Sequence, residues 1–539
     1  MHPQTILVNG TIFCADPART MARAIAIRDD RIVAVGGDEA VLAAAGPETE
    51  IIDLRGRMVT PGFQDAHVHP ASGGRILASC NLMEAGDAAG ATDIISAYHT
   101  ANPDGWLTGG GWRYTWFDRG CPSKETLDAL TGDRPAYLTV ADGHSGWANS
   151  AALSAAGIGA ATPDPADGRI ERNADGSPQG TLHEGAMDLV SAVIPPPTQS
   201  QMDDRVLAGQ GYLFSKGVTA WQDAWVTQEL HDTYLRLAET GRLRGNVRAA
   251  MWWDRLGDMD QIDRFLQARD QRHPRYVPGA VKLMLDGVCE NYTASLLGSY
   301  LDDHGSPTGN HGLDMIDPEQ LGQIVTELDR LGFQCHFHAI GDAAVRSALD
   351  AVESARMANG WSDLRHHIAH IQFVEPSDLP RFRRLGVAAN AQPLWACNEP
   401  AVTELTIPFV GDDRALTMYP FGSLLEHGAV MAMGSDWSVS TADVMDQISV
   451  AVSRQVPETS DSEPFLPAER IELADALCAF TSGSAWVNHL ESDRGTIHTG
   501  AVADLTVLSA NPFDVEAIFD VEVDLTYVDG EVVYERGTL

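Results

Sequence analysis

The feature that most constrains the fold is an alternation, through the middle of the chain, of short apolar β-rich runs with longer helical patterns. Such alternation is typical of a parallel sheet built from βα units, and eight units close a (β/α)₈ barrel. The predicted strands are 59–67, 217–223, 246–252, 280–285, 333–338, 366–372, 387–392 and 430–434. We therefore expect an α/β fold with a TIM barrel at its centre.

Both ends of the chain are predicted to form β-structure. The last two C-terminal runs are separated by Asp529-Gly530, a hairpin turn signal. The N-terminal runs are 5–9, 24–27, 31–35 and 51–53, and the C-terminal runs are 504–508, 524–528 and 531–534. Strands at both ends favour one small β-sandwich that the barrel splits in sequence. The expected division is 1–57 and 486–539 for the sandwich, and 58–485 for the barrel.

A long insertion separates the first two predicted barrel strands, at about residues 71–215. Its length of roughly 150 residues is far beyond that of ordinary βα loops. The segment is rich in Gly, Pro and Trp. Since it follows a strand at the carboxyl end of the barrel, we expect it to cover the mouth as a lid or subdomain.

The chain is strongly acidic, with 75 acidic and 37 basic residues among 539 and a formal charge of −38. Such a surface repels phosphate backbones and anionic lipid, which argues against nucleic-acid and membrane-surface partners. A small-molecule substrate is expected instead. The charge is explained by solubility, with adaptation to high salt left open, and a homo-oligomer is also left open.

The seven cysteines are scattered and form no CxxC pair, which favours free thiols in a reducing compartment. The N-terminal sequence has no pattern of a signal peptide, and no run of 18 or more apolar residues occurs. A cytoplasmic location is the resulting expectation.

Lysine is rare in this chain. Only three of the 37 basic residues are lysine, namely Lys124, Lys216 and Lys282. Arginine therefore serves wherever a positive charge suffices, and a retained lysine suggests chemistry that a guanidinium cannot perform.

His67 and His69 form an HxH motif directly after a β-rich run and Pro61-Gly62. Side chains alternate faces along a strand, so both imidazoles point to the same side. At the end of a barrel strand, the inner side faces the active site. The motif therefore predicts ligands for a divalent transition metal.

Further segments follow in a set order along the chain. They are Leu7-Val8-Asn9-Gly10, 58–62 with the HxH motif, 281–287, 338–342, His370-Ile371-Gln372, Gly434-Ser435-Asp436, 483–486 and 500–505. In this order they resemble the amidohydrolase superfamily, and most closely its N-substituted formamide deformylase-like branch, amidohydrolase family 3. The resemblance covers nearly the whole chain and implies a metal-dependent hydrolase.

The resemblance also implies ligands. His67 and His69 would bind the more buried metal, and His338 and His370 a second one. His336, His366 and His367 compete for these positions, but the sequences around His338 and His370 match the family better. The other three are expected to pack or hydrogen-bond within the barrel.

Lys282 matches a lysine that is often carboxylated to bridge two metals, a reaction open to an amine but not to a guanidinium. The alternative is an ordinary buried ion pair. Asp436, after the eighth strand, would bind metal and act as the catalytic base, the alternative being an N-cap of the next helix. The expected cofactor is one or two divalent metals, with zinc the leading candidate.

The implied reaction is hydrolysis. A metal lowers the pKa of bound water to about 7, and the resulting hydroxide attacks a carbonyl carbon. Asp436 would pass the captured proton to a departing amine. The predicted activity is therefore cleavage of a C–N, amide-type bond other than a peptide bond. Alternatives are cleavage of a cyclic amide, a carbamate or an ester, and, from another class, a non-catalytic scaffold.

Aromatic and polar residues near the predicted mouth suggest the substrate. Tryptophans gather at strand ends and in the insertion, which favours a pocket for an apolar or aryl substituent. Cys289 is interpreted as packing. The candidate substrate-binding residues are Trp112, His144, Trp225, Glu290 and Trp395.

Overall fold

The computed structural model describes residues 2–457, 459 and 462–537. Eight strands form one parallel sheet whose order follows the sequence, as a (β/α)₈ barrel requires. They are β8 (Phe63–Val68), β15 (Val218–Val226), β16 (Asn246–Trp252), β17 (Tyr276–Met284), β18 (Gln334–Ala339), β19 (His367–His370), β20 (Ala388–Ala391) and β21 (Met431–Met433). The predicted barrel is confirmed.

Hydrogen bonds join the two ends of this sheet. The Asn390 side-chain amide donates to the Ala66 carbonyl at 2.9 Å, and the Asp436 N–H donates to the His67 carbonyl at 2.8 Å. Helices lie outside: α7 (Gln199–Ser215), α8 (Gln228–Glu239), α9 (Ile262–Asp270), α10 (Pro318–Arg330), α11 (Asp342–Asn359), α12 (Leu379–Leu385), α16 (Phe421–Glu426) and α17 (Val444–Ser453). The hydrogen bonds of Asn390 and Asp436 thus hold the last strands of the sheet against its first strand, β8, which carries His67.

Helix α10 illustrates why these segments are helical. Its buried residues recur three and four positions apart, so one apolar face packs on the barrel. The helix begins after Asp317, whose carboxylate accepts hydrogen bonds from two backbone N–H groups of the first turn. By contrast, β18 is buried at every position, as expected of a parallel strand covered on both faces.

The first predicted strand, 59–67, is wrong as a single element. It divides at Gly62 into β7 (Met58–Pro61) and β8. Strand β7 pairs with terminal strands β2 (Thr11–Phe13) and β22 (Leu505–Leu508), not with the barrel. A Cβ at Gly62 would collide with the side chain of Thr219, so the chain can turn here only without a side chain. The hydrophobic run alone does not reveal this change of sheet.

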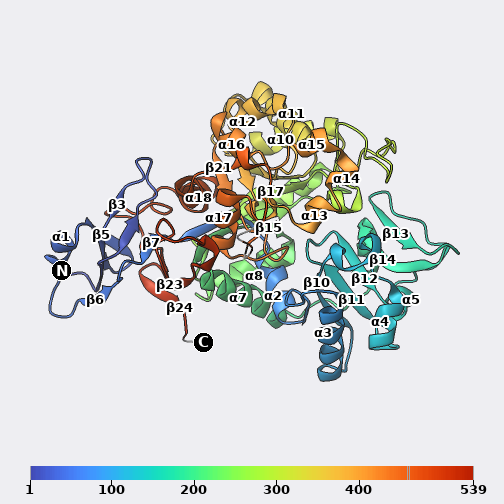
Figure 1. The fold of residues 1–539 in the computed structure, drawn as a ribbon, viewed down its shortest axis with the longest axis horizontal. Helices are drawn as coiled ribbons and strands as arrows, with labels where there is room; N and C mark the ends of the chain where they lie inside the picture. Colours follow the sequence, from blue (N-terminus) through green and yellow to red (C-terminus); the bar gives the residue numbers. More distant parts are fainter. Residues whose placement is uncertain (1, 458, 460–461, 538–539) are drawn as a thin grey trace.

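Both termini build a β-sandwich, as predicted (Figure 1). One sheet holds β1 (Thr5–Val8), β4 (Ala24–Arg28), β5 (Arg31–Gly36) and β6 (Glu50–Asp53), and the other adds β3 (Met21–Ala22), β23 (Val523–Val528) and β24 (Glu531–Glu535) to β2, β7 and β22. Leu7, Ile25, Val59 and Leu505 share one buried cluster. Asp529 and Gly530 both have positive φ, as the predicted β23–β24 hairpin turn requires.

The insertion has a six-stranded sheet and a buried core of its own, and it lies on the opposite side of the barrel from the sandwich (Figure 1). Its strands are β9 (Cys80–Asn81), β10 (Leu107–Trp112), β11 (Ala136–Val140), β12 (Ser145–Ala148), β13 (Gly168–Arg172) and β14 (Pro178–Glu184). Its helices include α3 (Ala88–Ala101), α4 (Lys124–Thr131) and α5 (Ser150–Ala155).

Two flanking helices connect the insertion to the barrel. Helix α2 (Pro70–Leu77) follows β8, and α7 precedes β15. Gly209 of α7 lies against the backbone of Pro70, which allows the two helices to approach closely. In the described part of the chain, no helix combines the length and hydropathy needed to cross a bilayer.

Candidate metal centre

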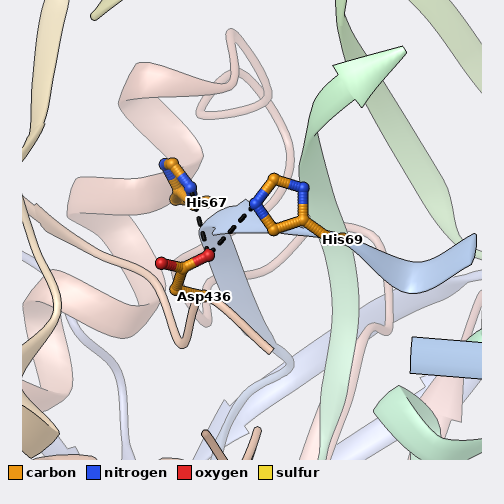
Figure 2. Close-up of side chains that lie close together, drawn as sticks. All are labelled: His67, His69 and Asp436. Atoms are coloured by element: carbon orange, nitrogen blue, oxygen red, sulfur yellow. Dashed lines mark ion pairs between the residues drawn. The ribbon is translucent and has the colours of Figure 1, made fainter. Parts of the chain in front are cut away.

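Side chains at the carboxyl ends of five barrel strands converge on one place. His67 lies on β8, with His69 just beyond it, and Asp436 follows β21. Figure 2 shows these three side chains pointing toward one another. Asp436 Oδ1 lies 3.3 Å from His67 Nε2 and 3.1 Å from His69 Nε2. One donor atom from each residue thus falls within the space that a single metal ion could occupy.

The other three predicted ligands surround this group. His370 Nδ1 lies 3.7 Å from Asp436 Oδ2, and the rings of His338 and His370 are 4.4 Å apart. Lys282 is buried on β17, beside His336, and strand β18 separates it from the strand of His370. His338 Nε2 also lies 3.4 Å from the Gly287 carbonyl oxygen. The structure therefore brings His67, His69 and Asp436 closest together, with the remaining three around them.

The electrostatics of the cluster fit a metal ion. Burial lowers the pKa of His67, His338 and His370 well below the ordinary value, so these imidazoles are neutral. Burial raises the pKa of Asp436, but the close contact with His69, 3.1 Å from Oδ1, and the neighbouring His370 and Lys282 outweigh it, so the pKa is lowered. Asp436 Oδ1 and both ring nitrogens of His370 are buried without a hydrogen-bond partner. Neutral nitrogen and anionic oxygen donors are the set that divalent transition metals prefer.

Lys282 is in an unusual state for a lysine. Burial lowers its pKa from 10.5 to about 7, so much of the side chain is an uncharged amine at neutral pH. An uncharged amine is the form that reacts with carbon dioxide. The surroundings of Lys282 thus suit carboxylation.

A buried chain of hydrogen bonds orients the imidazole ring of His67. Gln222 Oε1 can only accept, so His336 Nδ1, at 2.6 Å, must donate to it. His336 Nε2 is then an acceptor, and His67 Nδ1–H, 2.7 Å away, donates a hydrogen bond to it. This leaves the lone pair of His67 Nε2 directed at Asp436. His367 also bonds Gln222 Oε1, at 3.0 Å, so His336 and His367 serve the hydrogen-bonding role predicted for them.

Backbone strain also concentrates here. His370 and Asp436 have φ of 77° and 53°, a region that costs a non-glycine residue about 1–3 kcal/mol. The surrounding structure must therefore hold them in place. Asp65 fixes the backbone next to Asp436. Its carboxylate accepts hydrogen bonds from the His67 and Ser435 N–H groups and from the Ser435 hydroxyl.

A cavity of about 770 Å³ opens above the metal ligands. Aromatic side chains form much of its wall, and the metal-ligand candidates His338, His370 and Asp436 also line it. Trp395 lies 5.8 Å from the ring of His370, nearly parallel to it. Aromatic side chains lining the cavity are Trp112, Tyr114, Trp116, Tyr212, Trp395, Tyr419 and Trp437. The insertion and the barrel loops therefore enclose the cavity together.

Residues 50–534 match the model of the amidohydrolase family. The chain belongs to the amidohydrolase family. It is 32% identical to the protein LONG AFTER FAR-RED 3 of Arabidopsis thaliana, over 98% of this chain and 91% of that protein. It is 27% identical to an N-substituted formamide deformylase of Arthrobacter pascens, over 98% of each chain.

A solved structure shares the architecture. It is an uncharacterised metal-dependent hydrolase from Pyrococcus furiosus, 25% identical, with a TM-score of 0.73 over 95% of this chain and 100% of that one. The fold of this amidohydrolase is therefore that of the metal-dependent hydrolases.

The cavity of the amidohydrolase contains four of the five residues expected to contact substrate. Trp112, His144, Glu290 and Trp395 line it. Trp225 does not lie on this wall. It is 47% exposed and stacks on Trp252, 4.3 Å between ring centroids, and its ring centroid also lies 6.5 Å from that of His69.

Carboxyl groups also line the cavity. Burial raises the pKa of Asp142 to about 6, of Glu290 to about 7 and of Glu399 to about 7. Near neutral pH, Glu290 and Glu399 are therefore partly protonated, whereas Asp142 is mostly ionised. Glu399 was not anticipated, because it follows β20 in a loop segment whose sequence carries no motif.

Glu184 is a second residue that sequence reasoning missed. His144 Nδ1 lies 2.9 Å from its Oε1. Burial lowers the pKa of His144, but the charge and hydrogen bond of Glu184 outweigh it and raise the pKa to about 9. The same pairing lowers the pKa of Glu184, although burial alone would raise it. His144 is therefore a buried cation facing the cavity at neutral pH.

Glu184→Gln should lower the pKa of His144, because the burial that remains favours the neutral ring. In the wild type, the folded-state pKa of about 9 exceeds the ordinary 6.5, so the pair stabilises the fold fully below 6.5 and loses this contribution as pH rises through 9. An NMR titration of the histidine resonances measures the shift, with His144→Gln identifying the resonance. An unchanged pKa in Glu184→Gln would remove Glu184 as its cause.

Proposed function

We propose that this amidohydrolase cleaves a C–N, amide-type bond in a small molecule with an apolar or aryl substituent. The observation that carries the proposal is the position of the neutral imidazoles and the buried, unpartnered Asp436 Oδ1 at the floor of an aromatic cavity. Similarity to an N-substituted formamide deformylase over nearly the full length supports the bond type.

His67, His69 and Asp436 would hold one divalent metal, zinc being the leading candidate. His338 and His370 would hold a second, and Lys282 in carboxylated form would bridge the two. Bound there, such a metal supplies Lewis acidity that polarises a carbonyl group and lowers the pKa of water.

The protein's own groups supply proton transfer and positioning. Asp436 is charged and buried, so it can accept a proton from the attacking water and return it to the departing amine. The His144 cation, whose ring centroid lies 5.4 Å from that of His338, can donate a hydrogen bond to the substrate oxygen. Trp112, Trp395 and their aromatic neighbours would exclude water and hold the substituent.

A substrate panel tests this proposal. We expect an aryl-substituted formamide to exceed N-methylformamide in kcat/KM by about tenfold or more, since burying a ring is worth about 1.5–3 kcal/mol. The measurement is release of formate and amine, with chelated enzyme as the control. Turnover confined to lactams, carbamates or esters would replace the proposed bond type by the corresponding alternative.

A further inference from the structure

A second group of metal-ligand side chains lies in the insertion, apart from the barrel centre. Cys121 Sγ is 3.9 Å from His183 Nε2, which is 3.2 Å from Glu171 Oε1. One donor atom from each of the three lies within 4.8 Å of the others. The residues come from three segments: the turn after Asp118–Gly120, strand β13 and strand β14.

These separations fit zinc. Zinc binds thiolate sulfur at about 2.3 Å and imidazole nitrogen or carboxylate oxygen at about 2.0–2.2 Å. Tetrahedral ligands at those distances are roughly 3.3–3.6 Å apart. The observed 3.9 and 3.2 Å between the donor atoms therefore need shifts of only a few tenths of an ångström. Sulfur, nitrogen and carboxylate oxygen together are also a donor set that zinc accepts.

The outer nitrogen of His183 is fixed as it would be in a zinc ligand. His183 Nδ1 lies 2.6 Å from the Ser145 hydroxyl, which is itself 2.8 Å from the Tyr114 hydroxyl. If His183 Nδ1 donates to Ser145, the lone pair of Nε2 faces Cys121 and Glu171. Such second hydrogen bonds accompany almost every metal-bound histidine. Without metal, Nε2 can instead donate its proton in a hydrogen bond to Glu171 Oε1, and a metal would take the place of that hydrogen bond once the proton is on Nδ1.

The backbone around the three residues is already held. Gln179 Nε2 donates to the Cys121 carbonyl at 3.0 Å, and the Thr181 hydroxyl donates to the Pro122 carbonyl at 2.9 Å. Both bonds tie the turn to β14. Arg169 Nε holds Glu171 Oε1 at 2.7 Å and so orients the carboxylate. A metal would enter a site whose ligands need little ordering.

We propose that Cys121, Glu171 and His183 form a zinc site that fixes segment 113–121, which follows strand β10, to the β13–β14 hairpin. Binding replaces the thiol proton of Cys121, which is released to solvent, by the metal. Segment 113–121 carries Tyr114 and Trp116, which line the cavity. The site would therefore shape one wall of the cavity without taking part in the reaction, and it is independent of the function proposed above.

Cobalt substitution tests the proposal on the full chain. The barrel ligands include no cysteine, so a near-ultraviolet thiolate-to-cobalt charge-transfer band reports on the insertion alone. We expect the band in wild-type protein loaded with Co²⁺ and its loss on addition of Zn²⁺. It should persist in His67→Ala/Asp436→Ala, which disables the barrel centre, and disappear in Cys121→Ser.

Cys478→Ser is the matched control, since Cys478 is also a partly buried thiol but has no other ligand type grouped with it among the residues that the structure describes. This variant should keep the band. His183→Gln should lose it together with one equivalent of zinc, which covers the case in which Cys121→Ser does not fold. A wild-type protein without the band, or a band that survives in Cys121→Ser, would reduce the cluster to an ordinary hydrogen-bonded group.

Discussion

Asp436→Asn is expected to lower kcat by about 10²–10⁴-fold, the usual contribution of a positioned proton-transfer group. Asparagine keeps the shape and one oxygen donor but cannot accept the proton. The metal content should fall much less, because the histidines and Lys282 remain. The alternative role of Asp436 as an N-cap is not what the structure shows, since α17 begins at Val444 and is capped by Asp443.

Asp443→Asn is the matched control for this experiment. Asp443 lies on the same loop, but its carboxylate caps α17 and pairs with Lys216 at 2.8 Å, away from the metal ligands. We expect little change in kcat there. Both variants should be measured with metal analysis on the same preparations. An Asp436→Asn enzyme with full metal content and near-normal kcat would leave the catalytic base unidentified.

Lys282→Arg should abolish metal retention and reduce activity to the level of the chelated wild-type enzyme, while the barrel stays folded. A guanidinium cannot be carboxylated, and it stays charged among neutral histidines that burial keeps unprotonated. Metal analysis and circular dichroism separate loss of metal from loss of fold. Lys216→Arg is the control, because Lys216 pairs with Asp443 and lies over the Tyr212 ring, and arginine can make both contacts.

Lys282→Ala offers a complementary result. Added short-chain carboxylic acids can occupy the space of the missing carbamate, and some activity should return with them. Normal turnover in the arginine variant would instead show that Lys282 is merely a cation. A preparation with one tightly held metal and full activity would make Lys282 a neighbour of the metal and not a bridge.

Much of the barrel could be predicted because its strands carry their own local pattern. Strand β21, for example, lies within the continuous apolar run 429–433, and His67 and His69 mark a strand end by their spacing. The change of sheet at Gly62 could not be predicted, because it depends on pairing with Leu505 and its neighbours at the far end of the chain.

The candidate site shows the same division. The metal ligands lie within motifs, so their positions could be listed from the sequence. Glu184 and Gln222 act through partners distant in sequence, His144 and His336, and nothing in their own neighbourhood indicates that role. Trp225 at a strand end is not among the residues that line the cavity; its ring stacks on Trp252 and also lies 6.5 Å from that of His69, so its predicted contact with substrate stays a prediction.

Pairing between β7 and β22 also has a consequence for biosynthesis. Strand β7 already has β2 as one neighbour, but Pro61 of β7 faces Leu505 of β22, so its second neighbour is missing until the entire barrel has left the ribosome. At about 5–20 residues per second, that wait is on the order of tens of seconds. During this interval, the edge of β7 that will later pair with β22 has unpaired backbone N–H and C=O groups, and such an edge can pair with strands of other chains. Nascent chains of this protein would therefore depend on protection of that edge early in translation.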